Sequence, residues 1–182
     1  MKKIAAALAV LVFASPARAA WGSAKADFDA SAEEAAFAAA TQLFTETGRD
    51  KLAVVQFLES FISQFPKSPR VLDAEFMVGE AYLQHALSIL KAEAAAKRTS
   101  SARLLAPKNP AAAKALSDAQ KAFAAASEDK NSGLGPSAQY RLGEAAYNDK
   151  DWEKAVSEFK EVERRHPKAY INPEALLGII NA

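Results

Sequence analysis

The sequence predicts an all-α fold, a stack of about three antiparallel helix hairpins followed by a C-terminal helix. Alanine is the commonest residue and β-branched residues are few, a composition typical of helices. Prolines occur at intervals, often directly after a residue type that caps helices. Helical segments also recur along the chain. No stretch alternates between apolar and polar residues with a period of two, so no strand is expected.

The N-terminus has the pattern of a secretory signal peptide. Two lysines at 2–3 precede an apolar run over 4–14, and a proline then breaks the helical pattern. Residues 17–19 place alanines at the −3 and −1 positions of a cleavage site, so we expect 1–19 to be removed. An uncleaved membrane anchor is the alternative, but the apolar run is shorter than the roughly 20 residues that a spanning helix needs.

Cysteine content and charge limit the function classes. The chain has no cysteine, which excludes disulfides, thiolate metal sites, a cysteine nucleophile and a lipid anchor at the cleavage site. We therefore expect a periplasmic protein that is not a lipoprotein and has no transmembrane segment after cleavage. Cleavage removes three of the 23 basic residues and leaves 20 against 22 acidic ones, a net charge of −2. This balance argues against a nucleic-acid partner.

Capping signals divide the mature chain into seven helices. Ser31 and Glu34 form a capping box, Asp50 and Asp151 are good N-caps, and Gly48 is a good C-terminal stop. Three more starts pair a capping residue with a proline: Ser68-Pro69, Asn109-Pro110 and Asn172-Pro173. The expected helices are 31–47, 50–65, 69–98, 110–128, 136–148, 151–166 and 173–182.

The connections define the domain organisation. Residues 20–30 are expected to form a flexible lead, and 31–182 a single helical-repeat domain. Most connections are short, which favours antiparallel neighbours. Residues 129–135 are expected to form a loop, and 99–109 a longer insertion whose basic stretch is expected to be solvated, with an anion site as the alternative. Leu104-Leu105 within this insertion are unusual for a solvated loop, so we expect them to dock on the repeat stack or on a partner.

Two self-matches indicate repeats. Residues 74–81 (AEFMVGEA) and 138–145 (AQYRLGEA) match at an offset of 64. A second match, from 50–67 to 151–168, has an offset of 101, which is close to three helix-turn-helix units of about 34 residues. Gly79 and Gly143 would let the two helices of a hairpin approach closely. No single pair can bury its apolar face, so stacking creates the core.

These residues resemble a tetratricopeptide repeat. Residues 140–167 carry the Leu142-Gly143, Trp152, Ala155, Phe159 and Pro167 positions of that motif in register. The resemblance covers 31–182 and implies a right-handed α-solenoid in which the first helix of each hairpin lines a concave groove. The extended pattern over 65–82 is similar to bacterial envelope proteins, namely the BamD-like outer-membrane assembly proteins and the CpoB/YbgF-like periplasmic proteins of the Tol-Pal system.

The resemblance also implies which residues line the groove. They come from equivalent positions of two repeats: Phe76, Glu80, Leu83 and Gln84 from one, and Tyr140, Glu144, Tyr147 and Asn148 from the next. Aromatic side chains among carboxylates and amides would suit an extended or helical peptide with a basic element. The alternatives are that the two glutamates are ordinary solvated residues and that Phe76 and Tyr140 belong to the core.

The sequence offers little for catalysis. His85 and His166 are far apart, and no histidine or carboxylate cluster has metal-ligand spacing. His166 is expected to be a partly buried residue at a helix end. There is neither a glycine-rich phosphate loop nor a serine in a nucleophile elbow. We therefore expect no enzyme, cofactor or metal, and a cell-wall hydrolase with paired carboxylates is a minor alternative.

The expected function is a periplasmic scaffold that binds a protein or peptide partner during assembly or maintenance of the cell envelope and its outer membrane. The last predicted helix, 173–182, is apolar through Leu176, Leu177, Ile179 and Ile180. It could pack as a lid on 151–166, dock on another subunit, or continue into a longer chain. Alternatives to the scaffold are therefore self-association through Leu176, Ile179 and Ile180, or an N-terminal fragment of a longer repeat protein.

Overall fold

The computed structural model describes residues 22–46, 48, 50–96, 109–128 and 133–182. The predicted signal peptide and Leu104-Leu105 lie outside these residues. The chain divides into two compact units, 1–34 and 35–182. In the first unit, the described residues belong to the beginning of helix α2 (Gly22–Thr45). No strand occurs among the residues that the structure describes.

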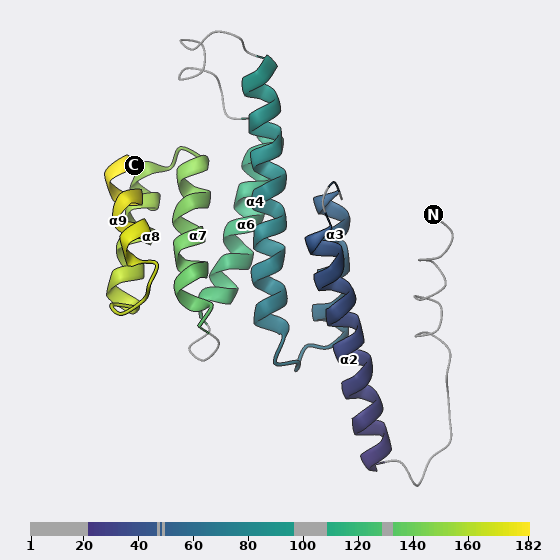
Figure 1. Ribbon diagram of the computed structural model, residues 1–182. Helices are drawn as coiled ribbons and strands as arrows, with labels where there is room; N and C mark the ends of the chain where they lie inside the picture. The colour runs from purple at the N-terminus through teal and green to yellow at the C-terminus, as the bar shows by residue number, and fades with distance from the viewer. Residues whose placement is uncertain (1–21, 47, 49, 97–108, 129–132) are drawn as a thin grey trace. The chain divides into compact units, whose positions relative to one another are not determined.

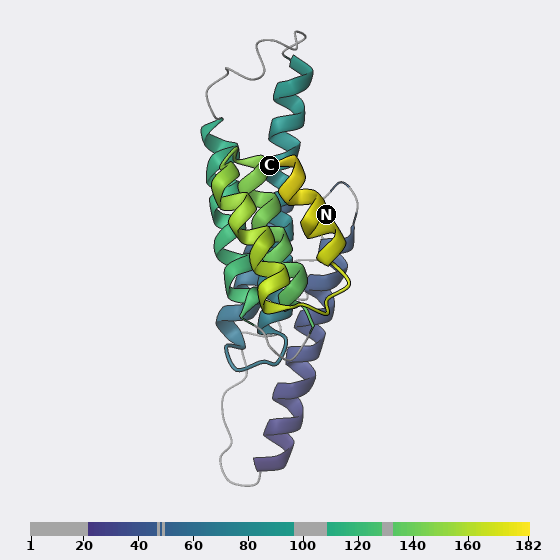
Figure 2. The same ribbon diagram turned by 90° about the vertical axis from the view of Figure 1, so that its left-hand side faces the viewer.

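The second unit is an all-α solenoid of stacked helix hairpins, as the sequence predicts. After the end of α2 its helices are α3 (Lys51–Gln64), α4 (Val71–Ala96), α6 (Pro110–Ser127), α7 (Gly135–Asn148), α8 (Trp152–Arg165) and α9 (Asn172–Asn181). From α3 to α9, each of these helices packs on the next one in this order. Figures 1 and 2 show α4, α6, α7, α8 and α9 as adjoining helices. Sequential helices are therefore spatial neighbours, which is the arrangement that short connections favour.

Several helix starts confirm the predicted caps. The Asp50 carboxylate accepts a hydrogen bond from the Leu52 amide at 3.0 Å, and Asp151 accepts from the Lys154 amide at 3.2 Å. Asn109 caps α6 by accepting from two backbone amides, at 3.0 and 3.3 Å. Gly48 follows α2 with a φ of +80°, a left-handed conformation that favours glycine. Local capping chemistry thus determines where these helices begin and end.

The start of α2 differs from the prediction. The helix begins at Gly22, so 22–30 are helical, and Ser31 and Glu34 lie inside the helix rather than in a capping box. An N-cap needs non-helical backbone angles. Residues 23–30 contain neither proline nor glycine, so nothing in them prevents the helix from extending toward the N-terminus. The flexibility of 20–30 stays a prediction.

Two of the capping residues before prolines also act differently. Helix α4 begins at Val71, and the Ser68 hydroxyl accepts from the Arg70 amide at 3.0 Å in the preceding turn. Asn172 is the first residue of α9 and makes no N-cap bond. Its side-chain amide instead donates to the His166 carbonyl at 3.1 Å and fixes the α8–α9 connection.

Three clusters of buried side chains form the core, and each one joins successive helices. The first surrounds Phe61 of α3 and includes α4, the second surrounds Phe123 of α6 with contributions from α4 and α7, and the third surrounds Phe159 of α8 with α7 and α9. A methyl group at Gly79 would lie 2.6 Å from the Phe123 ring, and one at Gly143 would lie 2.5 Å from the Phe159 ring. The glycines therefore allow an aromatic ring to touch the backbone of the facing helix.

None of the helices in the described part of the chain has an apolar stretch with both the length and the hydropathy that a membrane span requires.

Candidate functional site

A cavity of about 330 Å³ lies between α7 and α9. Its α7 wall consists of Tyr140, Glu144, Tyr147 and Asn148, which are four of the eight predicted groove residues. Successive members of this group are four, three and one residues apart, which places them on one face of a helix. The structure thus brings the second predicted group together around one cavity. Their role in binding a partner stays a prediction.

The floor and the opposite wall of this cavity depend on a close helix contact. The remaining lining residues are Phe159 of α8 and Glu174, Leu177, Gly178 and Asn181 of α9. Phe159 is 2% exposed and packs between Gly143 and Gly178. A methyl group at Gly178 would lie 2.6 Å from the Phe159 ring, so the absence of a side chain there lets α9 approach α8 closely.

Both tyrosines of the cavity are held by a second aromatic ring. The ring centroids of Tyr140 and Phe159 are 5.4 Å apart, and those of Tyr147 and Trp152 are 5.1 Å apart in an edge-on arrangement. These are favourable geometries for aromatic pairs. Trp152 itself is 43% exposed and extends the aromatic surface. Rings that are already fixed lose little conformational entropy when a ligand binds.

An ion-pair network connects the cavity to α4. Arg141 of α7 pairs with Glu144 on its own helix and with Glu80 of α4. The Oε1 atom of Glu80 is buried and lies 2.5 Å from the Arg141 Nε. Burial raises the pKa of the Glu80 carboxyl, Arg141 opposes this shift, and the negative charge of Glu144 adds to it. The network thus holds α4 and α7 together and occupies the Glu144 carboxylate.

Two further polar groups of the α7 wall have defined environments. Burial raises the pKa of the Tyr140 hydroxyl, and the neighbouring Glu144 raises it further. Tyr140 therefore stays neutral at physiological pH and keeps its hydroxyl proton for donation. The Asn148 amide donates to the Glu144 carbonyl at 2.8 Å, which fixes its orientation. Glu174 on α9 is exposed and adds a negative charge to the opposite wall.

The first predicted group does not line this cavity. Phe76 is half-buried and packs edge-on against Phe123, with centroids 5.6 Å apart. Gln84 is exposed on α4. Leu83 is only 4% exposed and shares the second core cluster with Leu142 of α7, so its prediction as a groove residue is wrong. The reason is that residues of α6 and α7 in this cluster, among them Leu116 and Leu142, pack around the Leu83 side chain.

Sequence reasoning missed Arg141 and the α9 wall. Arg141 is important because it reaches a carboxylate on another repeat, and such a pairing requires knowledge of how repeats stack. The α9 residues had a detectable signal. Aligning Pro136 with Pro173 places Leu177 and Asn181 at the repeat positions of Tyr140 and Glu144.

Neither histidine belongs to a potential metal-binding cluster among the residues that the structure describes. His166 is the half-buried C-cap of α8, as predicted, and burial together with Arg165 lowers the pKa of its imidazole. No group of three or more histidine and carboxylate side chains that could hold a metal occurs in the described part of the chain.

The comparison with protein families gave one match. Residues 137–169, which cover α7, α8 and the start of the next connection, match the tetratricopeptide repeat. This segment is thus similar to a repeat that typically serves as a non-catalytic scaffold for protein partners. Searches of the curated proteins and of the solved structures gave no significant match.

Proposed function

We propose that this protein is an exported scaffold that binds a segment of another protein in the cavity between α7 and α9. The tetratricopeptide match supports a role in protein–protein interaction, because it covers the hairpin that forms one wall and the floor of the cavity. The observation that carries the proposal is the lining of the cavity, which combines fixed tyrosines, amide side chains and an exposed apolar residue.

The lining suits an extended protein segment that carries a basic side chain. Tyr140 and Tyr147 offer rigid aromatic surface, which is typical of residues that dominate binding energy at interfaces. Amide side chains at Asn148 and Asn181 are of the type that pairs with a peptide backbone. The exposed Glu174 favours a lysine or arginine in the bound segment. The volume is at the low end of ordinary ligand pockets, so it would accept one or two side chains.

A matched pair of variants tests this use of the cavity. Leu177→Lys places a charge in the α9 wall, whereas Leu52→Lys makes the same change on α3, and both leucines are already exposed. Each variant and the natural chain are used as bait in extracts of the source cells. We expect the partner to be lost by Leu177→Lys and retained by Leu52→Lys. Retention by both variants would show that the cavity does not bind it.

The cellular setting is part of the proposal. Export is supported by the signal pattern of residues 1–19, and an envelope role by the resemblance of residues 65–82 to periplasmic and outer-membrane assembly proteins. Cell fractionation combined with the intact mass of the purified protein checks both points. We expect a periplasmic chain that begins at Ala20. A cytoplasmic chain that retains Met1 would contradict the proposal.

Self-association is a second candidate function because α9 exposes apolar side chains. Leu176, Leu177 and Ile180 are 48%, 59% and 78% exposed. Ile179 packs into the third core cluster, so it does not belong to this exposed surface as the sequence suggested. Light scattering of the natural chain and of Leu176→Ser with Ile180→Ser tests this function. A dimer that becomes a monomer in the double variant would favour self-association over the scaffold role of this surface.

A further inference from the structure

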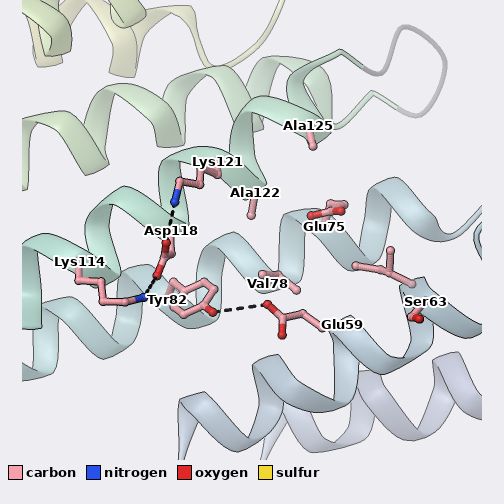
Figure 3. Close-up of a pocket in the computed structure, with 11 residues that line it drawn as sticks. Glu59, Ser63, Glu75, Val78, Tyr82, Lys114, Asp118, Lys121, Ala122 and Ala125 are labelled. Atoms are coloured by element: carbon pink, nitrogen blue, oxygen red, sulfur yellow. Dashed lines mark hydrogen bonds and ion pairs between the residues drawn. The ribbon is translucent and has the colours of Figure 1, made fainter.

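A second and larger cavity, of about 590 Å³, lies among α3, α4 and α6 (Figure 3). Its lining residues repeat at helical spacing on all three helices, as Glu75, Val78 and Tyr82 do on α4. The seven residue-to-residue steps from Glu75 to Tyr82 correspond to a length of about 10 Å along the helix. The cavity is therefore a groove about two helical turns long, and we call it the α3–α6 groove.

The floor of the α3–α6 groove is apolar. Val78 of α4 and Ala122 of α6 are buried, at 4% and 6% exposure, and Ile62 of α3 is half-buried beside them. Helices α3 and α6 both pack on α4, and the groove runs between α3 and α6. A partner side chain that lies on this floor would remove apolar surface from water, which favours binding.

The two ends of the groove carry different charges. At one end Lys114 and Lys121 both form ion pairs with the Asp118 carboxylate, at 2.6 and 3.0 Å, so two positive charges balance this negative charge (Figure 3). Toward the other end lie the carboxylates of Glu59 and Glu75. Tyr82 lies between the ends, and its hydroxyl donates to Glu59 at 3.5 Å.

Neither carboxylate of this acidic end forms an ion pair with a lysine or arginine of the described residues, and both lysines of the groove pair with Asp118. Burial raises the pKa of the Glu75 carboxyl, and repulsion by Glu59 raises it further. No cation in the described part of the chain opposes this shift. A positive group beside these two carboxylates would relieve their repulsion.

We propose that the α3–α6 groove is a second docking surface, which binds a protein segment that presents a lysine or arginine to Glu59 and Glu75 and an adjacent apolar side chain to Val78 and Ala122. This surface is formed by the second helices of two hairpins and by α4, and it shares no residue with the cavity between α7 and α9. The scaffold would thus hold two segments at once, from one partner or from two.

Selection from a random library of twelve-residue peptides displayed on phage tests the proposal. The full natural chain and Glu59→Gln with Glu75→Gln are used as separate targets. The control, Glu153→Gln with Glu163→Gln, removes the same charge from exposed positions of α8. We expect a class of peptides with a basic residue beside an apolar one that binds the natural chain and the control but binds the groove variant about tenfold more weakly.

The same peptides should bind Leu177→Lys with unchanged affinity, because that change lies in the other cavity. Far-UV circular dichroism and urea titration of each variant verify that it folds. The proposal is overturned if no peptide class distinguishes the natural chain from the groove variant. It is also overturned if the peptides that do so are acidic or neutral, or if they are lost equally in the α8 control.

Discussion

The contact between Gly143 and Phe159 makes a sharp test of the stacked-hairpin fold. A methyl group at Gly143 would lie 2.5 Å from the ring, well inside normal van der Waals distance. Overpacking of this kind costs about 1–3 kcal/mol. Replacing a glycine inside a helix by alanine contributes about 1 kcal/mol of opposite sign. Because the clash is close, we expect Gly143→Ala to lower the free energy of unfolding by a net amount of about 1–2 kcal/mol.

Removal of the ring should reverse this effect. Phe159→Ala alone is expected to cost about 3–5 kcal/mol, because a fully buried ring is replaced by a cavity. In that background the clash is gone, so Gly143→Ala should stabilise the chain by about 1 kcal/mol. The double-mutant cycle should therefore give a coupling energy of about 2–3 kcal/mol, as expected for residues in direct contact.

Urea denaturation followed by far-UV circular dichroism measures each corner of the cycle. Phe123→Ala is the matched control background, because Phe123 packs against Gly79 instead of Gly143. In this background Gly143→Ala should stay destabilising, while Gly79→Ala becomes stabilising. If Phe159→Ala is too unstable, Phe159→Leu gives a smaller coupling of the same sign. Equal costs of Gly143→Ala in all backgrounds would refute the proposed packing.

Three other predictions concern single side chains. Asn109→Ala should lower the unfolding free energy by about 1 kcal/mol, because α6 loses its N-cap. Amide hydrogen exchange checks the capping bond, which should be lost in this variant and kept in variants of Asp118 on the same helix. Arg141→Met should lower the unfolding free energy by only about 1 kcal/mol, because the arginine is partly exposed. It should also raise the pKa of Glu80 further, because Arg141 opposes the effect of burial. Adding Glu80→Gln should restore part of the lost stability, as measured by urea titration. Burial lowers the pKa of folded His166 below its ordinary 6.5, so the unfolded chain binds the proton more readily and stability should fall as the pH drops through about 6.5. His166→Phe, which matches Phe65 at the C-cap of α3, should remove this slope between pH 7.5 and 5.5, and an unchanged slope would assign it to another group.

Much of the fold was predictable because its determinants are local. Asn109-Pro110, Asp50 and Asp151 each mark a helix start through a side chain that caps its own backbone, and the structure places these caps as predicted. The predicted helix start at Ser31 was wrong because the residues before Ser31 also favour a helix, although Ser31 itself could serve as a cap. A local signal can show that a residue could cap a helix, but it cannot show that the helix begins at that residue.

The candidate site was only partly predictable because it depends on how repeats meet. The spacing of Tyr140, Glu144 and Tyr147 correctly placed them on one helix face, which is a local property. Leu83 occupies the repeat position of Tyr147, yet side chains of α6 and α7 bury it, and the sequence pattern of α4 alone does not reveal this. The α3–α6 groove was missed for the same reason, since its walls come from three helices and depend on how these helices pack.

Site-specific photocrosslinking in the source cells tests the central claim most directly. A benzophenone amino acid replaces Leu177 in the wall of the α7–α9 cavity or, as a control, Leu52 on α3. We predict a discrete adduct with another protein from position 177 that disappears when Tyr140→Ala and Asn148→Ala are added, and no such adduct from position 52. Adducts of equal yield from both positions, or an adduct at 177 that survives the two added changes, would contradict a binding groove between these helices.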